Sequence, residues 1–227
     1  EIYITSQRAF RAMGFPFGAD EDAGFIIAWL ELNHFNAIKI LHKLIKSIDQ
    51  QYDGVIKIQD LNQKIDFQNN TILMKGSGLV DYLQSTLSDK KEISVTIQNC
   101  SDGILFLPLL YKISKKIHYI ELNFDNSKNI INKYQIKNKK IFFKSDINQN
   151  LLLNDEVKII MNNHKTNLKK ISQKKIITEK IIQKNLSQSI DVNKDLWSQI
   201  SQIADKTFVP ESEDSRNKGA GGGDAND

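Results

Sequence analysis

The spacing of hydrophobic residues changes between the first 50 residues of this 227-residue chain and the segment that follows. In Ala19–Leu32 and Ala37–Ile48, apolar residues recur at intervals of three and four, the pattern of a helix with one buried face. From residue 53 to residue 162, several short runs alternate apolar with polar residues, which is typical of strands. These runs are Ile93–Ile97, Leu122–Phe124 and Val157–Ile159.

This change of period predicts an α+β fold with three parts. We expect an N-terminal helical cluster, a mixed or antiparallel sheet in the middle, and a C-terminal helix followed by a Gly-rich tail. Residues 1–206 would form a single domain, with helices over 1–50, a β-rich part over 53–162 and helical structure over 165–206. Residues 207–227 would form an acidic, Gly-rich tail, which we expect to dock on the N-terminal helices.

Glycine and proline suggest where the elements begin and end. Glu1–Met13 is predicted to be a helix that ends at Gly14, because glycine commonly follows the last turn of a helix. Gly76-Ser77-Gly78 is predicted to be a turn that opens a helix over Leu79–Leu87. Pro108 interrupts Ile104–Ile113, which fits either a strand or a short helix. Ile141-Phe142-Phe143 fits a short buried strand, and a last helix is expected from about Asn193 to Lys206.

Composition excludes several classes of protein. No apolar run approaches the roughly 18 residues that a membrane-spanning helix requires, so we expect no membrane association. The single cysteine, Cys100, fits a reducing compartment, and no secretory signal is visible, so we expect a cytoplasmic location. Seven lysines lie between Lys165 and Lys184 without an interleaved aromatic residue, and the net charge is only +4. Nucleic acid is therefore not the expected partner.

Alanine and arginine are absent from the whole stretch between Ile38 and Ile203, where isoleucine, lysine and asparagine are abundant. This composition is typical of an AT-rich genome. We infer that the two ends retain arginine and glycine because lysine and larger residues fail there. Arginine offers a planar fork that lysine cannot copy, and glycine permits positive φ and a close approach of the backbone. The alternative is that helical ends simply favour alanine, which leaves the arginines unexplained.

The arginines and glycines of the two ends suggest a site for an anion. Arg8 and Arg11 lie three residues apart and therefore share a helix face. Together with Arg216 and the backbone amides of Gly219 and Gly221, they could bind an anionic small molecule. Alternatively, the N-terminal arginines pair with acidic residues of the second helix or of the tail. The candidate acid–base residues are Glu213 and Glu21, and the candidate ligands of a divalent cation are Asp224 and Asp227.

Both ends of the chain carry motifs of a known family. The start of the chain has an Arg-rich, Ala-rich helix, a Gly-Ala-Asp-Glu-Asp-Ala-Gly segment at Gly18–Gly24, and Trp29-Leu30. With these motifs and those of its end, the chain resembles a bacterial family known as domain of unknown function 3726. The family provides no activity to carry over, so the resemblance supports the location of the site and not its chemistry. The matching residues of the end are Trp197, Ala204, Pro210, Ser212, Glu213, Ser215, Arg216, Gly219–Gly221, Asp224, Asn226 and Asp227.

Two functions fit these observations. The first is a small cytoplasmic enzyme, or a subunit of one, that acts on an anionic small metabolite at a site formed by both termini. Such an enzyme would be a homo-oligomer or would have a partner subunit. The second is a non-catalytic interaction module whose tail docks on a partner, for which Phe208-Val209-Pro210 would hold the start of the tail. A frayed, polar terminus is the simplest alternative for the tail itself.

Overall fold

The computed structural model describes residues 1–58, 60–61, 64–125, 131–143, 153–163 and 175–208. Within these residues the chain forms seven α-helices and one short 3₁₀ turn, η1 (Gly103–Leu105). The three N-terminal helices form where the hydrophobic spacing predicts them, and the last helix is present as well. The helices are α1 (Ile2–Ala12), α2 (Ala19–Leu32), α3 (Ala37–Ile48), α4 (Ile72–Ser88), α5 (Phe106–Ile113), α6 (Glu179–Leu186) and α7 (Lys194–Asp205).

The strands form one seven-stranded sheet in the order β1-β2-β6-β3-β4-β5-β7. Every pair of neighbours is antiparallel except β1 and β2, so the sheet is mixed and the predicted α+β class is confirmed. The alternating runs of the sequence lie in β2, β3 and β6, and the Ile-Phe-Phe segment lies in β5. The strands are β1 (Ile65–Asp66), β2 (Glu92–Ser101), β3 (Tyr119–Asp125), β4 (Ile131–Lys137), β5 (Lys140–Phe143), β6 (Leu153–Asn162) and β7 (Lys175–Ile177).

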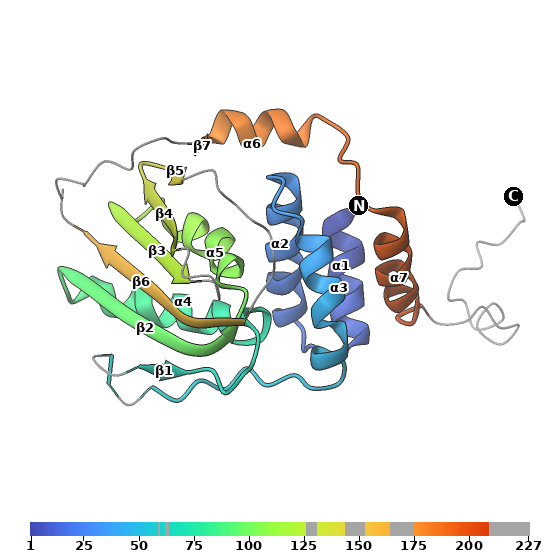
Figure 1. Cartoon of the computed structure of the whole chain (residues 1–227), viewed down its shortest axis with the longest axis horizontal. Helices are drawn as coiled ribbons and strands as arrows, with labels where there is room; N and C mark the ends of the chain where they lie inside the picture. The colour runs from blue at the N-terminus through green and yellow to red at the C-terminus, as the bar shows by residue number, and fades with distance from the viewer. Residues whose placement is uncertain (59, 62–63, 126–130, 144–152, 164–174, 209–227) are drawn as a thin grey trace, which may run out of the picture.

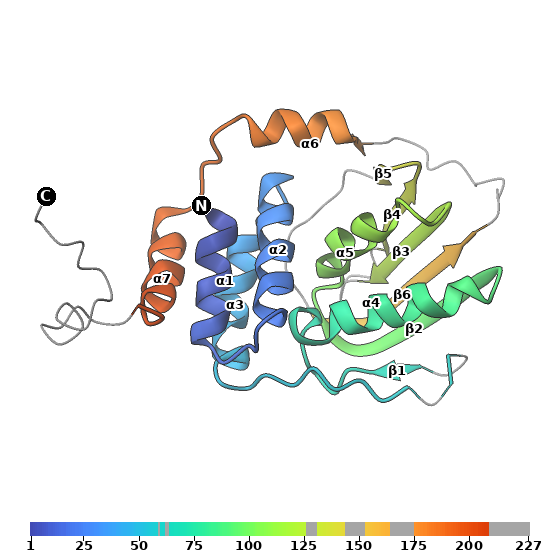
Figure 2. The same ribbon diagram turned by 180° about the vertical axis from the view of Figure 1, so that it is seen from behind.

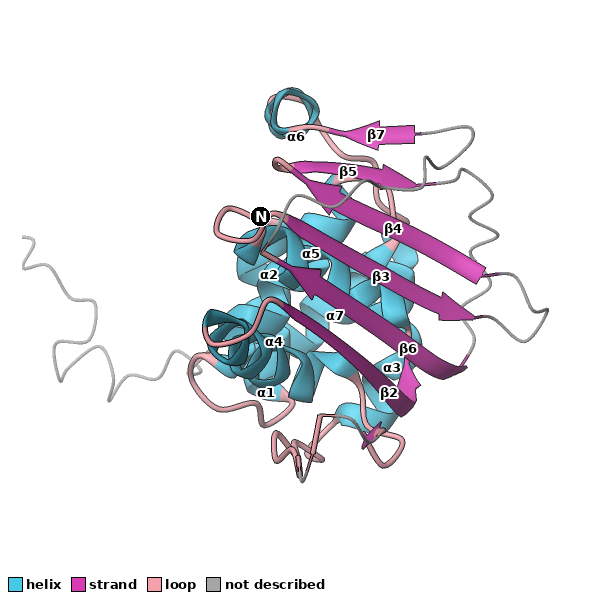
Figure 3. Cartoon of the chain, turned by 90° about the vertical axis from the view of Figure 1, so that its left-hand side faces the viewer, coloured by secondary structure: helices cyan, strands magenta, loops and turns pink. Residues whose placement is uncertain are grey.

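The elements are arranged in two blocks (Figures 1 and 2). Helices α1, α2 and α3 lie together with α7 on one side, and the sheet with α4 and α5 lies on the other. The apolar side chains of the strands, such as Val95, Ile120 and Ile159, are buried on the face that α4 and α5 cover. Figure 3 shows the opposite face of the sheet, in front of the helices, and none of the described helices covers it. One buried and one open face are usual for a sheet of antiparallel strands.

The N-terminal helices pack closely because small residues lie where they meet. A side-chain carbon at Gly24 of α2 would lie 3.1 Å from the backbone nitrogen of Gln7 in α1. The predicted stripe of α2, which includes Ile26 and Leu30, is fully buried. Helix α7 adds Ile200 and Ala204 to the same core and packs on α1 and α3. The first and last helices of the chain are therefore neighbours.

The turn predicted at Gly76-Ser77-Gly78 is wrong, because these residues lie inside α4. The helix begins at Ile72 instead, where the Thr71 hydroxyl accepts a hydrogen bond of 3.2 Å from the Leu73 amide. Gly76 is required by packing and not by a turn. A side-chain carbon there would lie 2.6 Å from Ile72 Cγ2 and 3.2 Å from Leu109 Cδ1 of α5.

The structure decides one open prediction and corrects another. The segment Ile104–Ile113, which fitted a strand or a helix, is helical, and Pro108 lies in the first turn of α5. Amides of a first turn have no partner within the helix, so proline is tolerated there. The segment expected to be helical from residue 165 contains the strand β7. None of the described helices is long and apolar enough to cross a membrane.

Gly76 and Gly78 provide a matched test of the packing of α4. We expect Gly76→Ala to destabilise the protein by about 1–3 kcal/mol, because the added methyl group collides with the stiff side chain of buried Ile72. Gly78→Ala should stabilise it by about 1 kcal/mol, because the nearest atom is 3.8 Å away and alanine favours a helix. Urea unfolding of both variants measures the difference, and an equal gain in both would contradict the close packing at Gly76.

Candidate functional site

Arg11 has an internal carboxylate as its partner. Its Nε and Nη2 atoms donate hydrogen bonds of 2.9 Å and 2.7 Å to Oδ2 of Asp20. The side chain of Asp20 is fully buried, and its Oδ1 accepts hydrogen bonds from the backbone amides of Gly18 and Glu21. The guanidinium group of Arg11 also lies 4.5 Å from the ring centroid of Phe17. The structure therefore agrees with the alternative in which Arg11 pairs with an acidic residue of the second helix.

Arg8 lies at the junction of the two chain ends. Its guanidinium carbon is 4.7 Å from the ring centroid of Phe208, the last described residue. The side chain of Glu21 is exposed on α2. The other candidate site residues of the tail, which are Glu213, Arg216, Gly219, Gly221, Asp224 and Asp227, lie outside the described residues, so a site shared by both termini stays a prediction. Within the described part of the chain, no cluster of three or more His, Cys, Asp or Glu side chains could hold a metal ion.

A pocket of about 400 Å³ lies where the connection from α3 to β1 passes the beginning of α4. Charged residues dominate its lining, with three lysines and three aspartates whose formal charges cancel. None of the lining residues belongs to the site that was predicted from the sequence. The lining residues are Asp53, Val55, Lys57, Ile58, Asp60, Lys64, Ile65, Asp66, Gln68 and Lys75.

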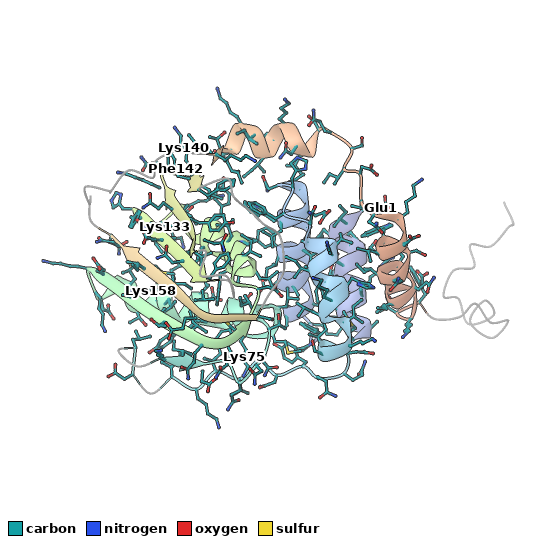
Figure 4. All side chains as sticks on the ribbon, in the orientation of Figure 1. Glu1, Lys75, Lys133, Lys140, Phe142 and Lys158 are labelled. Atoms are coloured by element: carbon teal, nitrogen blue, oxygen red, sulfur yellow. The ribbon has the colours of Figure 1, made fainter. Side chains whose placement is uncertain are left out.

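Lys75 is the most unusual residue of this pocket. Only 2% of its side chain is exposed, and its Nζ lies 2.9 Å from Oδ2 of Asp53. It belongs to the first turns of α4 and follows three buried apolar residues, so its ammonium group is held on the buried side of the helix. Figure 4 labels Lys75 in the lower part of the molecule, near the beginning of α4. A charged group buried to this extent requires an ionic or hydrogen-bonding partner.

Asp53 lies at the outer side of the same ion pair. Its side chain is 40% exposed, and its Oδ2 also accepts a hydrogen bond of 3.0 Å from Asn70 Nδ2. Its Oδ1 accepts a hydrogen bond of 3.0 Å from the Val55 amide. The hydrogen bonds from Lys75 and then from Val55 lower the pKa of Asp53, so the carboxylate is ionised at neutral pH.

Asp66 of β1 is a second fixed carboxylate of the lining. Its Oδ1 accepts hydrogen bonds of 2.7 Å from the Gln68 amide and 2.9 Å from Asn99 Nδ2, and these lower the pKa of Asp66. Lys64 pairs with Glu156 of β6. The pocket therefore combines one buried cation with carboxylates that are held in place, which suits a ligand carrying both an anionic group and hydrogen-bond donors.

A polar cluster on the open face of the sheet is a weaker candidate. Glu121 of β3 accepts hydrogen bonds from Lys133 at 2.7 Å, from Asn123 at 2.9 Å, from Gln135 at 3.1 Å and from the hydroxyl of Tyr119. Burial alone would raise the pKa of Glu121, but these hydrogen bonds outweigh it and lower the value to about 2. Because the carboxylate is already saturated with donors, we interpret this cluster as structural.

Asp102 is a half-buried acid whose pKa is raised toward neutral pH. It follows β2 with a left-handed backbone conformation. Burial raises the pKa of Asp102 to about 6, and the nearby charge of Lys43 opposes the shift only in part. Such a group could exchange a proton near neutral pH, which acid–base residues of active sites commonly do.

The first 70 residues match the model of the family described as protein of unknown function (DUF3726). The family resemblance is therefore confirmed for residues 1–70. The matched segment of this DUF3726 family covers α1, α2, α3 and most of the pocket lining, and it ends shortly before Lys75. The motifs at the end of the chain lie outside it. None of the curated proteins is significantly similar to the chain.

Solved structures of dehydrogenases have a similar fold. A malate dehydrogenase from Pyrococcus horikoshii OT3 is 9% identical with a TM-score of 0.63, and the likeness covers 93% of this chain and 95% of that one. A sulfolactate dehydrogenase from Methanocaldococcus jannaschii is 9% identical with a TM-score of 0.58, covering 90% and 95%. A dehydrogenase from Sinorhizobium meliloti is 7% identical with a TM-score of 0.63, covering 89% and 97%. At these identities the likeness concerns the fold alone.

The ion pair of Arg11 and Asp20 predicts unequal effects of two substitutions. Asp20→Ala should destabilise the protein by about 3 kcal/mol, because it removes the partner of Arg11 and leaves two backbone amides of the α2 start without their acceptor. Arg11→Lys should cost about 1 kcal/mol, since lysine retains the charge but loses the paired donors. Chemical denaturation measures both losses, and an unchanged stability of Asp20→Ala would exclude a structural role for the pair.

The cluster around Glu121 predicts a pH-dependent loss of stability. A carboxylate whose pKa is lowered on folding stabilises the protein above its ordinary pKa, and this contribution disappears as the pH falls through the folded-state value. Glu121→Gln should therefore reduce the free energy of unfolding by about 2 kcal/mol at pH 7, and the difference should vanish between pH 4.5 and about 2.

The matched control for this measurement is Glu92→Gln on the same sheet face. Glu92 is exposed and accepts a single side-chain hydrogen bond, from Asn162. Its substitution should change stability by less than about 0.5 kcal/mol. Equal losses in the two variants, or a loss that persists at pH 2, would contradict the account of Glu121.

Proposed function

We propose that the protein binds an anionic small metabolite in the Lys75 pocket and acts on it as an enzyme or as a subunit of one. The observation that carries the proposal is the ammonium group of Lys75, which is almost completely buried in the wall of a pocket of about 400 Å³. An ammonium group has three donors, and Asp53 provides its one ion pair among the described residues. An oxygen of an anionic ligand would be a suitable acceptor for this ammonium group.

The pocket is a better place for the anion than the arginines of α1. The guanidinium group of Arg11 already binds the carboxylate of Asp20, and that of Arg8 lies over the ring of Phe208. Lys57 also lines the Lys75 pocket and adds a second lysine side chain that could attract an anion.

The fold supports the enzymatic part of the proposal. Malate and sulfolactate, which the names of the similar dehydrogenases contain, are small anions at neutral pH. The same fold can serve unrelated activities, so this support is weaker than that of the pocket itself. The pocket volume falls within the range of cavities that bind small molecules.

A docking module remains the second candidate, and the contact between Arg8 and Phe208 favours it. This contact places Phe208, at the start of the tail, against α1. If the tail served a partner protein, its removal would abolish that interaction without changing the response to metabolites.

The proposal predicts that a small carboxylate such as malate or another metabolite anion raises the melting temperature of the protein through Lys75. Lys75→Met should weaken the binding of that ligand about 10- to 100-fold, because a charge-assisted hydrogen bond contributes roughly 1.5–3 kcal/mol. Lys184→Met is the matched control, since Lys184 is exposed on α6 far from the lining, and it should bind the ligand normally. Thermal-shift titration with a panel of metabolite anions checks this.

The same titration separates the pocket from the predicted terminal site. A chain that ends at Phe208 should respond to the ligand as the full chain does. A response that depends on residues 209–227 would instead favour a site shared by the termini. Failure of every anion in the panel to stabilise the full chain would remove the proposed function.

A further inference from the structure

The exposure of Lys75 and Asp53 determines what a ligand meets first. The side chain of Lys75 is only 2% exposed, whereas the side chain of its partner Asp53 is 40% exposed. An anion that enters the pocket therefore approaches the negative charge of Asp53 before it reaches the positive charge of Lys75. The carboxylate of a ligand that contacted Lys75 would repel the carboxylate of Asp53. The ligand and Asp53 therefore compete for the same ammonium group.

We infer that Asp53 is an internal occupant of the anion site of Lys75, and that a bound carboxylate takes its place. This inference rests on the proposed function and adds a regulatory contact to that site. When a ligand carboxylate replaces that of Asp53, the buried ammonium group of Lys75 again has a negatively charged partner. This exchange also makes binding depend on the connection between α3 and β1 that carries Asp53.

The surroundings of the pair determine which partner moves. Lys75 belongs to α4, and its side chain is almost completely buried. Asp53 lies in a connection in which residues 51–58 form neither helix nor strand. Beyond Lys75, its carboxylate is held by the Val55 amide and the side chain of Asn70. The carboxylate of Asp53 is already partly exposed, so its movement into water would cost mainly these hydrogen bonds and the ion pair, and water would replace them in part.

The inference predicts that removal of Asp53 creates a binding site for a small carboxylate. Asp53→Ala should lower the melting temperature by several degrees, because the buried ammonium group loses its counter-charge. Sodium acetate or formate should then restore the melting temperature in a saturable manner, since either anion reproduces the end of an aspartate side chain. The wild-type protein should bind acetate at least tenfold more weakly, because Asp53 occupies the site.

The control variants identify the site of rescue. Asp53→Ala combined with Lys75→Met should show no rescue, and sodium chloride at the same ionic strength provides the baseline for all proteins. If Asp53→Ala does not fold, Asp53→Asn retains the shape of the side chain and should still bind acetate more tightly than the wild type. Equal acetate responses in the wild type and the Asp53 variants, or rescue that persists without Lys75, would overturn the inference.

The outcome also separates this inference from the proposed function. Rescue by acetate in Asp53→Ala, together with no response of the wild type to any metabolite anion, would support the exchangeable site and reject the metabolite. Stabilisation of the wild type by a metabolite through Lys75, with no gain on removing Asp53, would retain the proposed function and reject the competition.

Discussion

The ion pair between Lys75 and Asp53 connects the two blocks of the molecule. Lys75 belongs to α4, which packs beneath the sheet, and Asp53 belongs to the connection that leaves the helical cluster after α3. The backbone amide of Asp53 also contacts the sulfur of Met74, and Asn70 binds its carboxylate from just before α4. A buried ammonium group needs a counter-charge, so this requirement determines the path of the connection and with it the shape of the pocket.

The arginines at the start of the chain have a simpler explanation than a ligand site. Two nitrogens of Arg11 donate to a single buried oxygen of Asp20, an arrangement that requires the flat guanidinium group. This geometry accounts for the presence of arginine in a chain that otherwise uses lysine, without any ligand. The structure at Arg11 is therefore compatible with the inference that arginine remains where lysine fails. At this position arginine is needed for the ion pair that joins α1 to α2, and not for a ligand.

The sequence predicts those elements whose pattern is local. The apolar stripe of α2 and the alternation in β2 are visible over one segment each, and both elements form where expected. Strand β1 has only two residues and depends on its parallel partner β2, so no local pattern reveals it. The start of α4 was missed because glycine suggests a turn, whereas Gly76 serves the close approach of α5.

The pocket cannot be predicted from a local sequence pattern, for a related reason. Most of its residues come from a stretch of irregular chain, and only the fold brings them together with β1 and Lys75 of α4. One local signal was present, because Lys75 follows Ile72, Leu73 and Met74 and therefore interrupts the apolar side of a helix. A charged residue in such a position is a better indicator of a site than a charged residue on an exposed face. Lysine is so common in this chain that the abundance of lysine does not indicate a site. Only the position of a lysine on the apolar side of a helix does.

The two ion pairs have opposite orientations, and this difference decides which one can receive an anion. In the pair of Arg11 and Asp20, the carboxylate is fully buried and the cation is 39% exposed. In the pair of Lys75 and Asp53, the cation is buried and the carboxylate is exposed. An incoming anion can replace only a carboxylate that is free to leave for water. The buried acid of the first pair also holds two amides at the start of α2, whereas the exposed acid of the second lies in an irregular connection, so we propose Lys75 and not Arg11 as the anion site.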